Sequence, residues 1–342
     1  MFESRYRDKK YLSQYSLSVE LFEEFSLKVT DVIPVRNVYI LCTDKGNKIL
    51  KKIDYSINDL EYINSAIKFI KDKFNRVFDF VETKDNKIYT IFNGDVYCVM
   101  NLIDGRECDF YNAVDVSIAA KGLGELHSAA EGFKYNINNK VVCGKTIDKF
   151  NRKLEEIEFF KSIANLHENK NEFDKVFLDN VNYYSDLIKK SIEILNASSY
   201  YKLCSEEDKV VLCHHDLAYH NILIYNDEAY FIDFDYAIID LKVHDLCNFI
   251  IKAIKECAFD IEKADLIIKD YCRSNILDKR EFEVLYGLMT FPEDFYSITR
   301  DYYTRRKEWE EEAFVERLNK RVLNKEDKEE FLEEFKKKFC ID

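Results

Sequence analysis

The chain has 342 residues, of which 51 are Lys or Arg and 64 are Asp or Glu, so its net charge is −13. This acidic balance excludes a protein that binds nucleic acid through a broad basic surface. Hydrophobic residues make up 47% of the chain and aromatic residues 15%, which is too apolar for a disordered chain. Only eight Gly and two Pro are present, too few for a loop-rich all-β fold. The composition predicts a globular protein with many helices.

The sequence contains no targeting or membrane signal. It has no run of about 18 apolar residues, and its charged first residues, MFESRYRDKK, lack the apolar segment of a secretory signal. The ten cysteines include no C-x-x-C pair, which predicts reduced thiols rather than a disulfide scaffold or a zinc site. We therefore expect synthesis in the cytoplasm, with neither a membrane nor a nucleic acid as partner.

The first hundred residues carry a strand pattern. A short helical pattern lies within residues 1–25, and Ser56 is placed to cap an amphipathic helix over residues 56–74. Runs rich in β-formers, separated by turn residues such as Asp44-Lys45-Gly46-Asn47, occupy residues 27–35, 37–43, 48–53, 76–83, 87–92 and 96–103. These six runs are one more than the five strands that we expect, in the order β-β-β-α-β-β, in an antiparallel sheet with one helix.

A helical region follows Asp104-Gly105. Helical apolar spacing covers residues 113–130, 149–164 and 175–195, and it resumes after Asp245. A small hairpin interrupts the helices, with strands at residues 222–225 and 229–232. The sequence therefore predicts an α+β protein with a sheet lobe over residues 1–104 and a helical lobe over residues 105–342.

Four polar residues around this hairpin carry chemistry: His214-x-Asp216-x4-Asn221, with Asp233 twelve residues later. The hairpin places Asn221 and Asp233 side by side at its open end, where amide and carboxylate oxygens suit Mg²⁺. Asp216 is close enough in the chain to meet a hydroxyl beside the metal. Phosphoryl transfer needs this combination of metal ligands and a carboxylate. The alternative is that the two carboxylates are solvated turn residues and that Asn221 caps a strand.

This pattern resembles the H-x-D-x4-N…I-D-F motif of the protein-kinase-like superfamily, in the branch of aminoglycoside phosphotransferases and choline kinases. The resemblance implies a bilobal fold, ATP and Mg²⁺ as cofactors, Asp216 as catalytic base, and Asn221 and Asp233 as metal ligands. Other segments are similar to the CotS-like spore coat kinase-like proteins. They are Arg36-Asn37-Val38-Tyr39, Gly105-Arg106-Glu107, Leu126-His127-Ser128 and the region around Phe291-Pro292.

The resemblance also implies a phosphate-contacting lysine on the third strand, where Lys51 stands. Glu61, on the following helix, is the expected ion-pair partner of Lys51, with Asp54 and Asp59 as competitors. Asp245 matches the family aspartate that braces the catalytic loop. Three features depart from the protein kinases: no G-x-G-x-x-G loop exists, His215 replaces the arginine of the catalytic loop, and no A-P-E follows Asp235. These departures argue against a regulated protein kinase.

Our hypothesis from the sequence is an ATP- and Mg²⁺-dependent phosphotransferase that acts on a hydroxyl of a small molecule and is associated with the spore coat and other coat proteins. A catalytically weak or inactive structural coat protein is the alternative, and an aminoglycoside phosphotransferase is the third. For the acceptor we expect an anionic or π-rich compound held by the segment 291–306. The candidate residues there are Phe295, Tyr296, Arg300, Tyr302, Tyr303, Arg305 and Arg306. In the alternative, these residues pack a helix.

Overall fold

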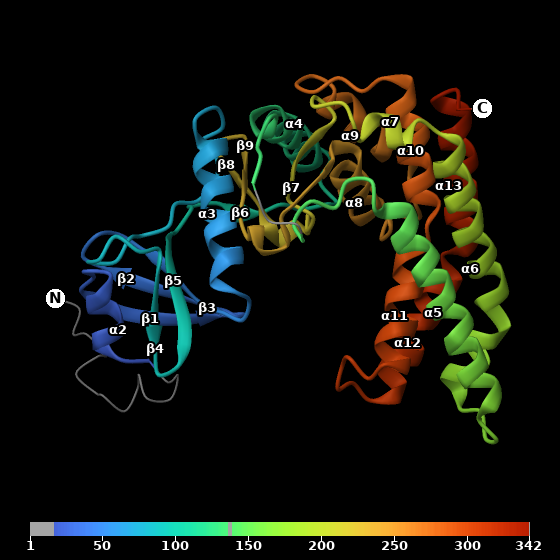
Figure 1. Cartoon of the computed structure of the whole chain (residues 1–342), viewed down its shortest axis with the longest axis horizontal. Helices are drawn as coiled ribbons and strands as arrows, with labels where there is room; N and C mark the ends of the chain where they lie inside the picture. Colours follow the sequence, from blue (N-terminus) through green and yellow to red (C-terminus); the bar gives the residue numbers. More distant parts are fainter. Residues whose placement is uncertain (1–16, 136–138, 342) are drawn as a thin grey trace. The chain divides into compact units, whose positions relative to one another are not determined.

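The computed structural model describes residues 17–135 and 139–341. The chain divides into two compact units, one formed by residues 1–107 and 221–235, the other by residues 108–220 and 236–342. Figure 1 shows the larger sheet in the first unit and the long helices in the second. The boundary expected after residue 104 lies within three residues of the first division. The hairpin expected in the second lobe belongs to the first unit instead.

The sheet of the first unit has five antiparallel strands in the order β1-β2-β3-β5-β4, which confirms the expected α+β fold. Its strands are β1 (Val29–Val35), β2 (Val38–Thr43), β3 (Lys48–Ile53), β4 (Tyr89–Phe92) and β5 (Asp95–Asn101). The run at residues 76–83 is not a strand of this sheet. Val77 bridges to Phe231 and Phe80 to Met100, so its two ends pair with different elements and no ladder forms.

Side chains alternate between the two faces of β3, and this alternation determines the face on which Lys51 lies. Leu50 packs on one face with Leu21 and Phe22 of α2 (Val19–Glu24). Ile53 packs on the opposite face with Leu60 of α3 (Ile57–Lys71), which begins at Ser56 as expected; the hydroxyl of Ser56 accepts a hydrogen bond from the Asp59 amide. Because side chains alternate along a strand, Lys51 lies on the α3 face of the sheet. Any pattern before residue 17 lies outside the described residues.

The predicted small hairpin is present and packs within the first unit. It consists of β8 (Ile222–Tyr225) and β9 (Glu228–Phe231), joined by Asn226 and Asp227, whose φ angles of 49° and 59° suit a tight two-residue turn. β6 (Arg106–Glu107), which the sequence pattern did not reveal, adds a third strand beside β8. The Phe231 amide donates to the Arg76 carbonyl and fixes β9 against the segment that follows α3.

The second unit is mostly helical, as predicted. Its helices are α4 (Ala113–Ala130), α5 (Thr146–Leu166), α6 (Glu172–Ala197), α7 (Tyr200–Leu203), α8 (Lys242–Ile254), α9 (Ile261–Tyr271), α10 (Lys279–Thr290), α11 (Glu293–Tyr303), α12 (Glu311–Leu323) and α13 (Lys325–Lys338). α4 approaches α9 closely at Gly124, where a Cβ would lie 2.5 Å from the Tyr271 carbonyl oxygen.

Two short strands of the second unit carry the loop that contains Asp216. β7 (Val210–Cys213) pairs antiparallel with β10 (Ile238–Leu241). The sequence Ile-Ile-Asp-Leu of β10 has no alternation that would distinguish it from a helix start, so the strand was not predicted. Among the described helices, none is both long and apolar enough to cross a membrane. All ten cysteines are free thiols.

Candidate active site

Lys51 is the centre of a charged group in the first unit. Its Nζ donates to Asp233 Oδ1 and to Asp235 Oδ2, each at 2.6 Å. The Tyr55 hydroxyl donates to Asp235 Oδ1 at 3.0 Å. Burial favours the neutral amine, but the two carboxylates outweigh this effect and raise the pKa of Lys51 above its ordinary value. The lysine is therefore held as a partly buried, charged ammonium at the position that the sequence assigned to it.

The expected pairing of Lys51 with Glu61 is wrong in this structure. Glu61 lies exposed on α3, while the Lys51 side chain is only 15% exposed and contacts the loop after β9. Asp54 and Asp59 do not pair with it either; within the described ranges, its ion pairs are those with Asp233 and Asp235. Two carboxylates on a short loop satisfy the ammonium more completely than a single glutamate on a solvated helix face.

The hairpin brings Asn221 and Asp233 to the same end, as its turn predicted. The Ile232 amide donates to the Asn221 carbonyl at 3.0 Å, which extends the β8–β9 pairing by one step beyond Ile222 and Phe231. Asp233 follows with a φ of 65°, a left-handed conformation that costs energy for a residue other than Gly and is common at functional sites. Asn221 is buried, whereas the Asp233 side chain is 38% exposed.

The charge balance of this group fits a hard divalent cation. Asp233 and Asp235 carry two negative charges against the single positive charge of Lys51. The oxygen donors offered by Asn221 and Asp233 are the kind that Mg²⁺ prefers. The surplus negative charge and the partly exposed Asp233 carboxylate suit such an ion.

Asp216 lies in the second unit and has a lysine partner of its own. Lys252 of α8 donates to Asp216 Oδ1 at 2.5 Å, and the two side chains are 25% and 30% exposed, respectively. Burial opposes ionisation of the carboxyl group, but the hydrogen bond and charge of Lys252 prevail and lower the pKa of Asp216. At neutral pH Asp216 is an ionised carboxylate within reach of solvent, the state that a proton acceptor requires.

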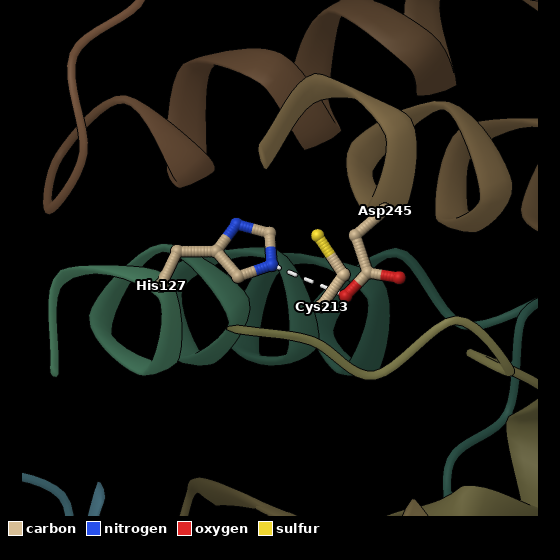
Figure 2. A group of neighbouring side chains, drawn as sticks. All are labelled: His127, Cys213 and Asp245. Carbon is tan, nitrogen blue, oxygen red and sulfur yellow. Dashed lines mark hydrogen bonds and ion pairs between the residues drawn. The ribbon is translucent and has the colours of Figure 1, made fainter. Parts of the chain in front are cut away.

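The loop that carries Asp216 is held by Asp245 of α8. Asp245 Oδ2 accepts from the His214 amide at 2.6 Å, and Oδ1 accepts from the His215 amide at 2.7 Å. The side chain of His127, on α4, contacts the same carboxylate at 3.2 Å (Figure 2). Burial would raise the pKa of Asp245, but the His127 hydrogen bond and nearby charges lower it to about 2. Asp245 therefore braces the loop, as the resemblance implied.

Figure 2 also shows Cys213 beside His127 and Asp245, a buried set of three groups that are able to bind metals. Each already has a hydrogen-bond partner. His127 Nδ1 lies 2.8 Å from the Tyr271 hydroxyl, and Cys213 Sγ lies 3.5 Å from the Leu241 carbonyl oxygen. Burial raises the pKa of the Cys213 thiol well above its ordinary value, which disfavours the thiolate that a metal would need. The arrangement is that of a hydrogen-bonded brace.

The segment 291–306 lines a cavity only over residues 291–295, and not at the tyrosines and arginines that were expected to form the acceptor wall. Tyr302 stacks on Phe173 with ring centroids 3.7 Å apart, and Tyr303 stacks on Phe160. Arg300 is paired with its neighbour Asp301. Of the seven residues named for this role, Phe295 alone lines the 350 Å³ cavity of the second unit described below. The alternative, that this segment packs a helix, is correct for most of its aromatic side chains.

Sequence reasoning missed three functional candidates. Tyr55 and Lys252 stand at positions that no motif marked, and only the folded chain pairs them with Asp235 and Asp216. Asp235 stands in the segment Ile232-Asp233-Phe234-Asp235, but nothing in that segment links it to Lys51. The sequence signal for Asp235 was the pair of aspartates, Asp233 and Asp235, on either side of the buried Phe234.

Related sequences cover most of the chain. Spore coat protein S of Bacillus subtilis (strain 168) is 22% identical over 303 residues, which are 87% of this chain and 86% of that protein. Endospore coat-associated protein YutH of the same organism is 23% identical over 266 residues, covering 76% and 74%. Protein LicA of Haemophilus influenzae (strain ATCC 51907 / DSM 11121 / KW20 / Rd) is 24% identical over 247 residues, covering 62% and 88%.

Solved structures share the fold at low sequence identity. An aminoglycoside phosphotransferase from Alicyclobacillus acidocaldarius superimposes with a TM-score of 0.82 at 16% identity, covering 94% of this chain and 96% of that one. A spectinomycin phosphotransferase in complex with ADP and spectinomycin gives 0.63 at 16% identity, covering 91% and 93%. An ethanolamine kinase from Plasmodium vivax gives 0.56 at 15% identity, covering 91% and 85%. These likenesses confirm the expected protein-kinase-like fold.

A family model matches residues 18–335, nearly the whole chain; its description is "Spore coat putative kinase YutH".

Proposed function

Since this chain belongs to the YutH family of spore coat kinase-like proteins, we propose that it is an ATP- and Mg²⁺-dependent phosphotransferase that acts on a hydroxyl of a small molecule. The observation that carries the proposal is the state of two side chains. Lys51 is kept charged by Asp233 and Asp235, and Asp216 is kept ionised by Lys252. A fold retained for structural reasons alone would not need both groups in these states.

Each residue has a role in this proposal. Asp216 orients the acceptor hydroxyl and takes its proton, because an ionised, partly exposed carboxylate is suited to do so. Lys51 contacts the phosphates of ATP through its ammonium group. Asn221 and Asp233 would hold Mg²⁺, which when bound neutralises charge on the phosphates.

The names of the relatives support an association with the spore coat and with other coat proteins after synthesis in the cytoplasm. They also favour a second candidate, a structural coat protein without turnover. A specific observation agrees with it: β1 and β2 are joined by Arg36 and Asn37 alone, with Arg36 at a φ of 51° and paired with Glu107. A two-residue turn is too short to form a glycine-rich cover over the phosphates.

Two measurements test the proposal. The first is calorimetric titration with ATP in millimolar Mg²⁺, and the second is ADP formation with a panel of hydroxylated metabolites. We expect wild type to bind ATP only with Mg²⁺ present and Asp216→Asn to keep that affinity while losing about 10²–10⁴-fold of its turnover. Asp186→Asn, which removes a carboxylate from an exposed ion pair with Lys189, is the matched control. No ATP binding by wild type would favour the structural coat protein, and equal turnover in Asp216→Asn and wild type would remove Asp216 from its role.

A further inference from the structure

A cavity of about 350 Å³ lies within the second unit and reaches the surroundings of Asp216. His215, the residue before Asp216 in the chain, lines it, as does Lys252, whose Nζ binds the Asp216 carboxylate. α5, α6, α8, α11, α12 and α13 each contribute to its walls. A cavity of this volume accommodates a small molecule.

The walls of this cavity are rich in positive charge, although the chain as a whole has a net negative charge. Seven Lys or Arg side chains line it but only two carboxylates, Glu293 and Asp294, whereas acidic residues outnumber basic ones in the whole sequence. Lys153 pairs with Glu293 at 2.6 Å. Asp294 is shared between Lys255 at 3.5 Å and Arg321 at 3.8 Å. The two carboxylates are therefore already engaged by three of the cations.

Of the four remaining cations that line the cavity, Lys252 is paired with Asp216, and the other three lack a carboxylate partner among the described residues. Lys325 Nζ stands 3.7 Å from the centre of the Tyr183 ring, and Lys328 Nζ donates to the Phe291 carbonyl at 3.1 Å. Lys149, Lys325 and Lys328 form no ion pair within the described ranges 17–135 and 139–341. Burial lowers the pKa of Lys328 to about 8, as expected of an ammonium without a close counter-ion.

Arg321 shows the same deficit of negative charge. Its Nη1 atom is buried and has no hydrogen-bond partner in the described part of the chain, because Asp294 and Glu256 lie at 3.8 and 3.9 Å. A buried donor without a partner costs about 1–3 kcal/mol. An anionic group brought into this cavity would meet several cations and satisfy such donors.

We propose that the cavity binds the acceptor of the reaction and that this acceptor is a hydroxylated small molecule carrying a phosphate or carboxylate group. The inference rests on the proposed function and names its substrate class. Aromatic rings of Phe150, Phe291 and Tyr184 line the same space and would cover the apolar face of the carbon skeleton. A cationic amino alcohol or an aminoglycoside would meet like charge instead.

The acceptor hydroxyl oxygen forms a bond to the γ-phosphorus of ATP, the bond from that phosphorus to the bridging oxygen breaks, and ADP leaves with the electron pair. The hydroxyl proton passes to Asp216, which Lys252 keeps ionised until that moment. The anionic group of the acceptor stays bound by the lysines and does not react.

Binding without nucleotide tests the cavity independently of catalysis. Calorimetric titrations of the full chain would use glycerol 3-phosphate and glucose 6-phosphate as phosphates, gluconate as carboxylate, glucose as neutral compound, and choline and spectinomycin as cations. We expect a phosphate or carboxylate to bind, with an affinity that falls as salt rises, and the other compounds not to bind. The two anion classes identify which charged group is preferred.

Lys328→Gln and Lys325→Gln should each weaken anion binding about tenfold, the cost of one lost charge-assisted hydrogen bond. Lys325 keeps the test open if Lys328→Gln fails to fold. Lys189→Gln, on an exposed face of α6 paired with Asp186, should bind as wild type does. Binding of choline or spectinomycin in preference to every anion would overturn the inference while leaving the proposed phosphotransferase intact. Lysine-dependent anion binding without any ADP formation would support the cavity and overturn the phosphotransferase.

Discussion

The two candidate groups of this protein have opposite charge balances. In the first unit one ammonium, Lys51, faces two carboxylates, so the group around it is left with surplus negative charge. In the second unit one carboxylate, Asp216, faces Lys252 beside a cavity with a surplus of lysines and arginines. The first arrangement attracts a cation and the second an anion, because like charges brought together out of water lower the energy of a counter-ion there.

The two groups are also held by different means. Asp233 stands after a hairpin strand in a left-handed conformation, and Asp216 stands on a loop whose backbone amides are bound by the buried Asp245. The position of Asp233 therefore depends on a turn and on strand register. The position of Asp216 depends on the side chain of Asp245, which is distant in the sequence.

The largest effect is expected at Asp245. Asp245→Ala removes the acceptor of the His214 and His215 amides and leaves both without their partner, so the free energy of unfolding should fall by about 3–5 kcal/mol. Chemical denaturation measures it. Asp186→Ala, at an exposed ion pair, should change the unfolding free energy by less than about 1 kcal/mol. Similar losses in both variants would show that Asp245 is not a brace.

Asp233→Asn tests the negative surplus of the first group. Asn adopts positive φ more readily than most residues, so the backbone at 233 is kept while one charge is lost. We expect Mg²⁺-dependent ATP binding to weaken by at least about 100-fold, since even residues that merely orient a metal ligand are worth 10–100-fold. Calorimetry at several Mg²⁺ concentrations measures this. Asp227→Asn, at the exposed tip of the same hairpin, is the control, and equal weakening in the two would contradict the assignment.

Local patterns in the sequence accounted for the first group better than for the second. The turn at Asn226-Asp227 fixes the register of the hairpin, and the register fixes the end at which Asn221 and Asp233 meet. Strand alternation likewise places Lys51 on one face of β3. These features depend on residues near one another in the chain, so their spacing predicts them.

The partners of these residues come from distant elements and had no such signal. Lys252 stands 36 residues from Asp216, and Lys51 is 182 residues from Asp233, so only the packing of the fold brings each pair together. Glu61 was preferred for Lys51 because it is near in sequence, and that prediction was wrong for the same reason. The cationic cavity draws one or two lysines or arginines from each of several helices, a pattern that no single segment of an acidic chain displays.

Asp233→Asn removes a negative charge from the group around Lys51, whereas Lys51→Met removes its positive charge. ATP affinity should fall about tenfold, because one charge-assisted hydrogen bond to phosphate is lost. Mg²⁺ affinity without nucleotide should rise, since Asp233 and Asp235 are then left without their cation. Lys52→Met is the matched control: Lys52 is next in the chain, 52% exposed and paired with Asp95. If Mg²⁺ binding in the Lys51 variant were weaker or unchanged, the surplus of negative charge would not be what attracts the ion.

The smallest expected effect is a shift in pH dependence caused by Lys252. Burial by itself would raise the pKa of Asp216, and Lys252 is what lowers it, so Lys252→Met should move the acid limb of kcat/KM to higher pH. The stability follows the same sign. Because the folded pKa of Asp216 lies below its unfolded value of about 3.9, its carboxylate contributes stability above about pH 4 that is lost as the pH falls through the folded pKa. Without Lys252 that contribution should vanish.

Lys255→Met removes another cation from the cavity wall, one paired with Asp294 rather than with Asp216, and should leave the acid limb in place. A limb that moves equally in both variants would mean that the general cationic field of the cavity, and not the contact with Lys252, keeps Asp216 ionised.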